Sequence, residues 1–182
     1  MNKVKHLFLV LLLVMAQLPL SATNIELSWS FNQGDAKALQ GTVSEEGLFS
    51  YATSSLGSDL EFLGTNKAGS LTVTKVQPKV KASNNGDGNA ISFSLKTKKG
   101  LSLSVKSFSF DACKLGTNGG SIDVVAEAGG KSYELLKDES PQNAKNDPYF
   151  THYKADLSQI PATEGEWVIK VFVKNVAINK QY

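Results

Sequence analysis

The sequence predicts an all-β protein whose antiparallel strands form a two-sheet β-sandwich of the jelly-roll type. Three observations support this prediction. Apolar residues recur at every second position, and the spacing typical of amphipathic helices is missing. Clusters of Gly, Asn and Asp, which favour tight turns, separate the apolar runs. Many short strands without helical crossovers indicate two packed antiparallel sheets.

The expected strands follow one another through short polar turns. We expect these turns at residues 84–89, 98–100, 116–120 and 129–130. The Gly129-Gly130 pair separates two strand-like runs and is typical of a two-residue hairpin turn. Alternation is clearest in stretches that carry Ile25, Leu27 and Trp29, then Leu71, Val73 and Val76, and then Ile91, Phe93 and Leu95.

Two further stretches constrain how the strands pack. The apolar side chains change from odd to even positions at Lys106-Ser107, which predicts a bulge or short turn there. The run 167–176 is apolar at both odd and even positions, which is typical of a central strand covered on both sides. Both Trp29 and Trp167 lie in apolar alternation and are expected in the core.

Residues 1–22 have the pattern of a secretory signal peptide. Lys3 and Lys5 precede the apolar run 7–15, and a small-residue cleavage site ends at Ala22. The apolar run is about half the roughly 20 residues that a membrane-spanning helix needs, so we expect no membrane span. Residues 23–182 are therefore expected to form one exported domain, located in the medium, the periplasm or on the outer surface.

The composition of this domain limits the classes of partner that it is expected to bind. Once Lys3 and Lys5 are removed with the leader, 17 lysines face 17 acidic residues, so nucleic acid is a disfavoured partner. The chain contains no arginine, which removes the usual bidentate group for phosphate or carboxylate. Cys113 is the only cysteine and lies in an apolar alternation, where we expect a small buried hydrophobe; an intermolecular disulfide is the alternative.

Five short segments of the chain carry a resemblance to a known family: 29–34, 74–78, 108–124, 171–176 and 179–181. In this order they resemble an N-terminal accessory β-sandwich domain of secreted bacterial polysaccharide-degrading proteins such as pectate lyases. The resemblance implies a galactose-binding-like jelly roll that holds a polysaccharide, pectic in that family, or positions a catalytic domain. It also implies that residues 23–182 lack the last strand, which would leave an edge of the run 167–176 exposed.

The residues predict no catalytic centre. His152 stands between aromatic residues, and a histidine without a positioned partner is more often a surface or hydrogen-bonded strand residue than a general base. The acid pairs Glu45-Glu46 and Glu164–Glu166 are more typical of solvated surface than of a glycosidase pair. The common hydrolase and metalloprotease motifs are missing from the sequence, and we expect the domain not to be an enzyme.

A structural calcium ion is a weaker alternative to a domain without cofactors. Asp111, Asn118 and Asp123 flank the glycine-rich turn 116–120 or lie within it, and they carry oxygen ligands. The dense Asp alternation of a calcium loop is missing, so a sharp turn is the simpler interpretation. The segment 85–89 is a second weak candidate, with a hairpin tip as its alternative.

The segment 142–153 carries the side-chain types that bind sugars, which are aromatic faces for the ring and polar groups for its hydroxyls. Tyr149 and Tyr153 could stack on a sugar ring, or they could cap the edge of the sandwich. The residues expected to hydrogen-bond a ligand are Asn143, Lys145, Asn146 and Asp147.

Three classes of function follow from the sequence. The first is a noncatalytic carbohydrate-binding or accessory module with a polysaccharide as ligand. The second is a structural β-sandwich that packs against a catalytic domain or another partner protein and binds no glycan. The third, which the sequence favours least, is an enzyme within these residues.

Overall fold

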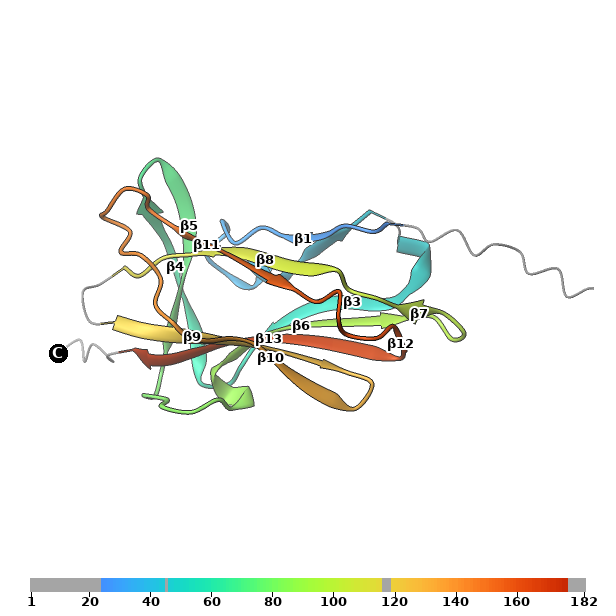
Figure 1. Cartoon of the computed structure of the whole chain (residues 1–182). Coiled ribbons are helices and arrows are strands. Elements are labelled where there is room, and N and C mark those ends of the chain that lie inside the picture. The colour runs from blue at the N-terminus through green and yellow to red at the C-terminus, as the bar shows by residue number, and fades with distance from the viewer. Residues whose placement is uncertain (1–23, 45, 116–118, 177–182) are drawn as a thin grey trace, which may run out of the picture.

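The computed structural model describes residues 24–44, 46–115 and 119–176. These residues form an all-β fold in which every pairing between strands is antiparallel (Figure 1). The predicted signal peptide, Glu45, Asn118 and the final residues 177–182 lie outside the described residues. No helix within the described part of the chain has the length and apolar character to cross a membrane.

The largest element is a five-stranded sheet in the strand order β10-β9-β13-β6-β3. Its central strand β13 pairs with β9 on one edge and with β6 on the other. The predicted central position of the run 167–176 is therefore confirmed. The five strands are β3 (Phe49–Leu56), β6 (Ala90–Thr97), β9 (Gly119–Ala128), β10 (Lys131–Glu139) and β13 (Glu166–Val176).

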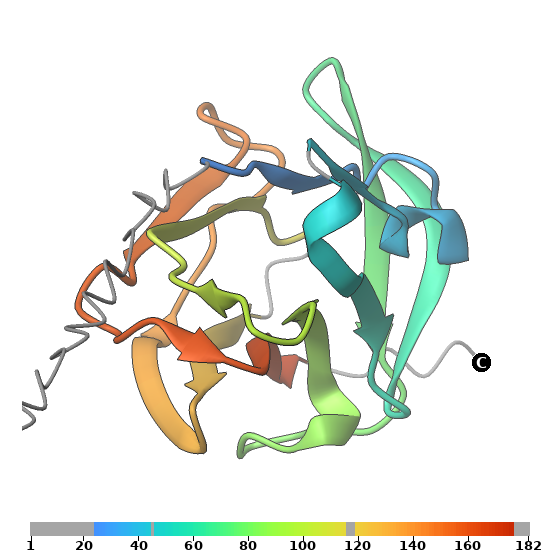
Figure 2. The same cartoon turned by 90° about the vertical axis from the view of Figure 1, so that its right-hand side faces the viewer.

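Four two-stranded sheets complete the described fold. The β8–β11 and β1–β2 pairs lie across the core from the five-stranded sheet. Figure 2, which looks along the strands of Figure 1, shows this arrangement. Three short 3-10 helices occur in connections: η1 (Ala36–Leu39), η2 (Glu46–Leu48) and η3 (Asp87–Asn89). The two-stranded sheets are β1 (Leu27–Trp29) with β2 (Gly41–Val43), β4 (Leu60–Ala68) with β5 (Leu71–Pro78), β7 (Ser102–Leu103) with β12 (Thr163–Glu164), and β8 (Ser107–Ala112) with β11 (Thr151–Asp156).

A chain of aromatic rings links the five-stranded sheet to the smaller sheets. Phe93 on β6 contacts Trp29 on β1 and Phe108 on β8, with ring centroids 4.9 and 5.3 Å apart. Phe110 continues the chain on β8 and stacks on Tyr153 of β11 at 5.1 Å. Such ring pairs add stability beyond the area they bury. The predicted alternation of β1, β6 and β8 thus contributes to one shared core.

Two local predictions are confirmed. Gly129 and Gly130 connect β9 to β10 as a two-residue turn with φ of 57° and 72°, and Ala128 pairs with Lys131 across it. Positive φ at both turn positions is a conformation that glycine adopts without steric cost. The predicted break at Lys106-Ser107 also exists, since β7 ends at Leu103 and β8 begins at Ser107.

Two other expectations need correction or refinement. The expected exposed edge of the run 167–176 is wrong, because both edges of β13 are hydrogen-bonded to neighbouring strands. Trp167 is completely buried, as expected, whereas Trp29 is only half-buried at the margin of the core. Cys113 is a half-buried free thiol, and burial raises its pKa.

We expect Trp167→Ala to lower the free energy of unfolding by about 3–5 kcal/mol, because it leaves a cavity at the centre of the core. The substitution also removes the hydrogen bond from Trp167 Nε1 to the carbonyl oxygen of Leu103, which measures 3.2 Å. Urea unfolding followed by circular dichroism would measure the loss. Leu71→Ala is the control, since this side chain is 58% exposed and should change stability by no more than about 0.5 kcal/mol. Similar losses in both variants would contradict the assigned core.

Candidate functional site

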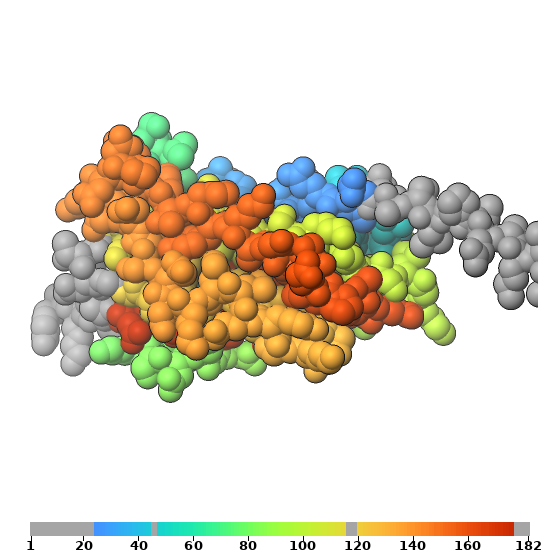
Figure 3. Space-filling view, in the orientation of Figure 1, coloured from blue at the N-terminus to red at the C-terminus, as the bar shows by residue number. Residues whose placement is uncertain are grey.

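The segment predicted to bind sugar is a loop between β10 and β11 that is tied down at its ends. The Lys114 N–H donates to the carbonyl oxygen of Gln142 at 2.7 Å, and the Ala144 N–H donates back to that of Lys114 at 2.8 Å. The Gln142 N–H also donates to Thr151 Oγ1 at 2.8 Å. These bonds give the loop a defined backbone path. In Figure 3 it forms the orange bulge at one end of the molecule, beside the green β4–β5 hairpin.

Tyr149 lies at the contact between this loop and the β4–β5 hairpin. Its ring rests on Gly69 in the hairpin turn, so closely that a Cβ at that glycine would collide with it. Gly69 also has a φ of +59°, which favours glycine for a second reason. The tyrosine nevertheless remains 39% exposed. The hairpin therefore holds an aromatic ring in place while leaving part of it open to solvent.

The polar residues of the predicted site have two different roles. Lys145, Asn146 and Asp147 are exposed in the same loop as Tyr149 and are open to a ligand. Asn143 is half-buried, and its side-chain Oδ1 accepts from the Lys145 N–H at 2.9 Å while its carbonyl oxygen accepts from the Asn146 N–H at 2.9 Å. Asn143 thus shapes the turn that presents its neighbours.

Tyr153 does not belong to this surface, which corrects the prediction that it stacks on a sugar. It lies on β11 with only 6% of its area exposed, and its ring stacks on Phe110 in the core. The reason is strand alternation, because Tyr153 and Ala155 point inward while His152 and Lys154 point outward.

His152 is a surface strand residue with a cross-strand partner. Its Nδ1 lies 2.8 Å from Oδ1 of Asp111, the residue opposite it on β8. Both side chains are mostly exposed, at 64% and 62%. This matches the expected hydrogen-bonded strand histidine. It also places Asp111, one of the calcium candidates, in a pair with the imidazole.

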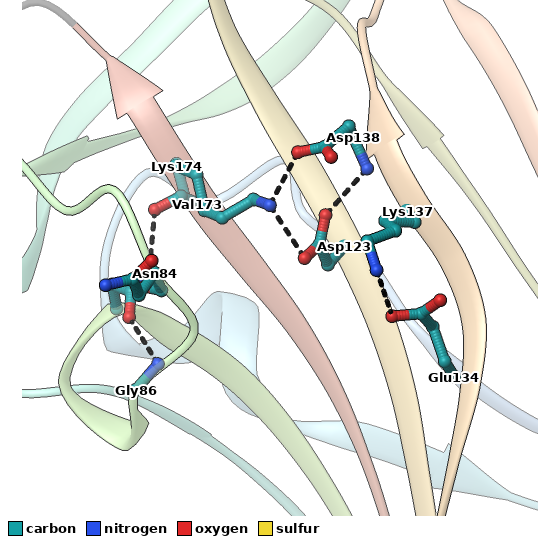
Figure 4. Close-up of polar contacts among 9 residues, drawn as sticks. Asn84, Gly86, Asp123, Glu134, Lys137, Asp138, Val173 and Lys174 are labelled. Atoms are coloured by element: carbon teal, nitrogen blue, oxygen red, sulfur yellow. Dashed lines mark hydrogen bonds and ion pairs between the residues drawn. The ribbon is translucent and has the colours of Figure 1, made fainter.

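Asp123, another calcium candidate, already has a cation beside it. Lys174 Nζ lies 2.7 Å from Asp123 Oδ2 and 2.7 Å from Asp138 Oδ1 (Figure 4). A lysine ammonium therefore takes the place that a metal ion would occupy between the two carboxylates. No three His, Cys, Asp or Glu side chains gather into a metal site among the described residues, which do not include Asn118.

This ion pair is buried, although sequence reasoning did not predict it. The side chains of Lys174 and Asp123 are only 7% and 5% exposed, whereas Asp138 is 63% exposed. The Asp138 N–H donates to Asp123 Oδ1 at 2.7 Å, so both oxygens of the buried carboxylate accept a hydrogen bond. Asp138 has a φ of 51° and lies within a bulged stretch of β10.

The surroundings shift the pKa of both buried groups toward their charged forms. Desolvation alone would raise the pKa of Asp123, but hydrogen bonds from Lys174, from the backbone of Asp138 and from Asn85 outweigh it and lower the pKa. Desolvation likewise opposes the charge on Lys174, yet its bonds to Asp123 and Asp138 raise the pKa above the ordinary value. The pair therefore stays ionised across the neutral range.

The loop between β5 and β6 closes one side of this ion pair. Its backbone is fastened at both ends, since the Asn175 N–H donates to the carbonyl oxygen of Ala82 at 2.8 Å and Asn89 Nδ2 donates to that of Val173 at 2.9 Å. A hollow of about 340 Å³ lies between this loop and strands β9, β10 and β13. Its lining consists of Ser83, Asn84, Asn85, Asp123, Glu134, Lys137, Asp138 and Lys174.

A larger groove of about 620 Å³ lies by the β9–β10 turn. Its lining is acidic, with three glutamates and one lysine beside the two turn glycines and Val168. Two of the glutamates are held by protein donors: Glu127 Oε1 accepts from Lys170 Nζ at 2.8 Å, and Glu164 Oε1 accepts from the Gly100 N–H at 2.8 Å. The groove is thus open and polar, and its charge disfavours anionic ligands.

The sequence carried one signal for the buried ion pair. Lys170 and Lys174 interrupt an apolar strand and, four residues apart, lie on the same face of it. A lysine in a central strand is rarely buried without a partner. The partners could not be read from the sequence, because Asp123 and Asp138 belong to two other strands.

Comparisons with known proteins do not extend this picture, because no family model, no curated protein and no solved structure matches the chain. Fold and site together define an all-β antiparallel protein with a main five-stranded sheet. The resemblance to an accessory domain of polysaccharide-degrading proteins stays a prediction.

We expect Lys174→Met to lower the free energy of unfolding by about 3–5 kcal/mol, because it leaves the buried Asp123 carboxylate without its cation. Lys137→Met is the matched control. Lys137 pairs with Glu134 at 3.1 Å, but both side chains are more than half exposed, so its loss should be below about 1 kcal/mol. Chemical denaturation of both variants measures the difference, and equal losses would contradict the burial of the Lys174 pair.

The lowered pKa of Asp123 also predicts how stability depends on pH. Its contribution is present above the ordinary aspartate pKa of about 3.9 and is lost as the pH falls through the lower folded value. We expect Asp123→Asn to be less stable at neutral pH but to lose less stability on acidification than the unsubstituted protein. Denaturation midpoints measured across the acid range test this. The Ser158 backbone N–H also lowers the pKa of Asp156, but Asp156 is present in both proteins and contributes equally to both profiles. Parallel stability profiles of the two proteins in acid would therefore refute the assignment to Asp123.

Proposed function

We propose that this chain is a noncatalytic carbohydrate-binding or accessory module of a secreted polysaccharide-degrading system, built as a galactose-binding-like jelly-roll sandwich. The observation that carries the proposal is Tyr149, whose ring is fixed on Gly69 and is still 39% exposed. A ring that is already immobilised loses little conformational entropy when a sugar stacks on it. Lys145, Asn146 and Asp147 supply donors and acceptors in the same loop.

A polysaccharide is the ligand that this surface suits best. The exposed loop and hairpin are open to water, as expected for a polymer that must lie across them and continue beyond. The resemblance noted from the sequence favours a pectic polysaccharide in a bacterial secreted, periplasmic or outer-surface setting. Two exposed lysines, Lys67 in the hairpin and Lys145 in the loop, are compatible with uronic acid groups as point charges.

A noncatalytic role fits the exposure of the groups that could act in catalysis. His152 and Asp111 form a pair on the outer side of two strands, where both remain mostly in water. A pair surrounded by water lacks the dry, preorganised environment that makes catalytic proton transfer efficient. The proposal therefore assigns this pair to the surface.

The second candidate is a structural module that packs against a partner protein and binds no glycan. The β4–β5 hairpin favours it, because Leu71 and Leu63 are 58% and 41% exposed. Large apolar side chains at a projecting hairpin are typical of contact surfaces. A catalytic domain of the same secreted system is the partner that this alternative would require.

Affinity electrophoresis in gels that contain neutral or uronic-acid polysaccharides tests the glycan proposal. We expect retardation by at least one polymer, and we expect Tyr149→Ala to weaken it about tenfold, which corresponds to about 1.4 kcal/mol. Tyr149→Phe should retain most of the binding, since the ring remains. Gly69→Ala should weaken binding with the ring still present, because the new Cβ displaces it.

Tyr51→Ala is the matched control for this experiment. Tyr51 is a half-exposed tyrosine on β3 that hydrogen-bonds to Glu166, an interaction that raises the pKa of its phenol. It lies outside the loop–hairpin surface, so its substitution should leave glycan binding unchanged. A folded protein that no polymer retards, or equal losses for Tyr51→Ala and Tyr149→Ala, would refute the proposed site and favour the structural module.

A further inference from the structure

The hollow around Lys174 has the features of a built binding site. Two charged side chains that are more than nine-tenths buried, Asp123 and Lys174, form part of its wall. Its volume is about 340 Å³, and it opens to water, since most of its lining residues are exposed. The loop over it is held to β13 by backbone and side-chain hydrogen bonds. The pocket is therefore preformed.

Stability alone does not account for this arrangement. Buried ion pairs are often no more stabilising than apolar residues of the same volume, because desolvation offsets their attraction. Asp138 and Asn175 also adopt positive φ, at 51° and 54°, which non-glycine residues rarely do. Asn175 donates its N–H to Ala82 at the start of the loop, and Asp138 donates its own to Asp123. Such backbone conformations are found preferentially at functional sites.

Every charged side chain that lines the pocket already has a partner within the protein, and the acidic side chains outnumber the lysines three to two. Lys174 is shared between Asp123 and Asp138, and Lys137 pairs with Glu134 at 3.1 Å. An anionic ligand would be repelled by the excess acidic charge or would have to displace a carboxylate from its lysine. An uncharged ligand can use the positions that remain on the lysine ammonium groups and the aspartate oxygens without breaking a pair.

The remaining polar groups mix donors and acceptors at close quarters. Ser83, Asn84 and Asn85 also line the pocket, and the Asn85 side chain already hydrogen-bonds to Asp123. A hydroxyl group donates one hydrogen bond and accepts two, so neighbouring hydroxyls on a ring match such a lining. Apolar ligands would leave these groups unsatisfied.

We propose that this pocket is a second ligand site, which takes a single neutral sugar residue or a similar small polyol. The proposal goes beyond the glycan surface at Tyr149 and does not depend on it, because the two sites share no residue. In Figure 1 both lie at the same end of the molecule, the loop of residues 140–150 above and the β5–β6 connection below.

Nuclear magnetic resonance titration of the uniformly ¹⁵N-labelled protein tests this proposal with two sugars of one ring structure. D-galactose is neutral and D-galacturonate is anionic. We expect galactose to cause saturable shifts in the backbone amides of Asn84, Asn85 and Asp138. D-galacturonate should bind at least about tenfold more weakly, a difference of about 1.4 kcal/mol.

Variants separate this pocket from the Tyr149 surface. Asn84→Ala and Lys137→Ala should each weaken galactose binding several-fold, whereas Lys131→Ala, an exposed lysine at the far end of β10, should leave it unchanged. Tyr149→Ala should also leave these shifts unchanged. The proposal is overturned if galactose produces no saturable shift at these amides, if galacturonate binds as well as galactose, or if Tyr149→Ala abolishes the shifts.

Discussion

Lys174 lies on the central strand of the five-stranded sheet, where 7% of its side chain is exposed, and an ammonium group in that position must be neutralised. Three strands of the sheet meet this need together, because the two carboxylate partners of Lys174 come from β9 and from the bulged stretch of β10. Lys170 lies four residues earlier on the same face of the strand and is likewise neutralised by carboxylates. Its side chain is 15% exposed and pairs with Glu127 and Asp87.

These pairings explain why the polar pocket lies where it does. Lys170 reaches Asp87 in η3 at 3.0 Å, and Asn89 in the same short helix bonds the backbone of β13, so the β5–β6 connection is drawn over the end of the central strand. The opposite face of that strand carries Trp167 and Ile169, which anchor the core. One strand therefore positions both the apolar interior and the polar hollow, and a shift in its register would disturb both.

Local features of the sequence predicted much of the fold, whereas contacts between distant strands were not predictable. An apolar run on both faces identified the central strand, and the Gly129-Gly130 pair identified the β9–β10 hairpin, because both signals depend on adjacent residues. The inward direction of Tyr153 follows from the same kind of local signal, its alternation with His152 and Lys154, but the prediction of a sugar-stacking tyrosine overlooked it. The contact of Tyr149 with Gly69 and the pairing of Lys174 with its carboxylates depend on strand order, which local patterns do not determine.

Charge distinguishes the two ends of the molecule as surfaces for an anionic polymer. The groove at the β9–β10 turn presents three glutamates and one lysine, so a uronic-acid chain would be repelled there. At the other end, the hairpin and loop that meet at the Tyr149 ring carry the exposed Lys67 and Lys145 beside the acidic Asp147. The pocket beside Lys174 has three acidic side chains against two lysines, so it adds no net attraction for a carboxylate. On both proposals, a chain of neutral and acidic sugars would place its acidic residues at the tyrosine and a neutral residue in the pocket.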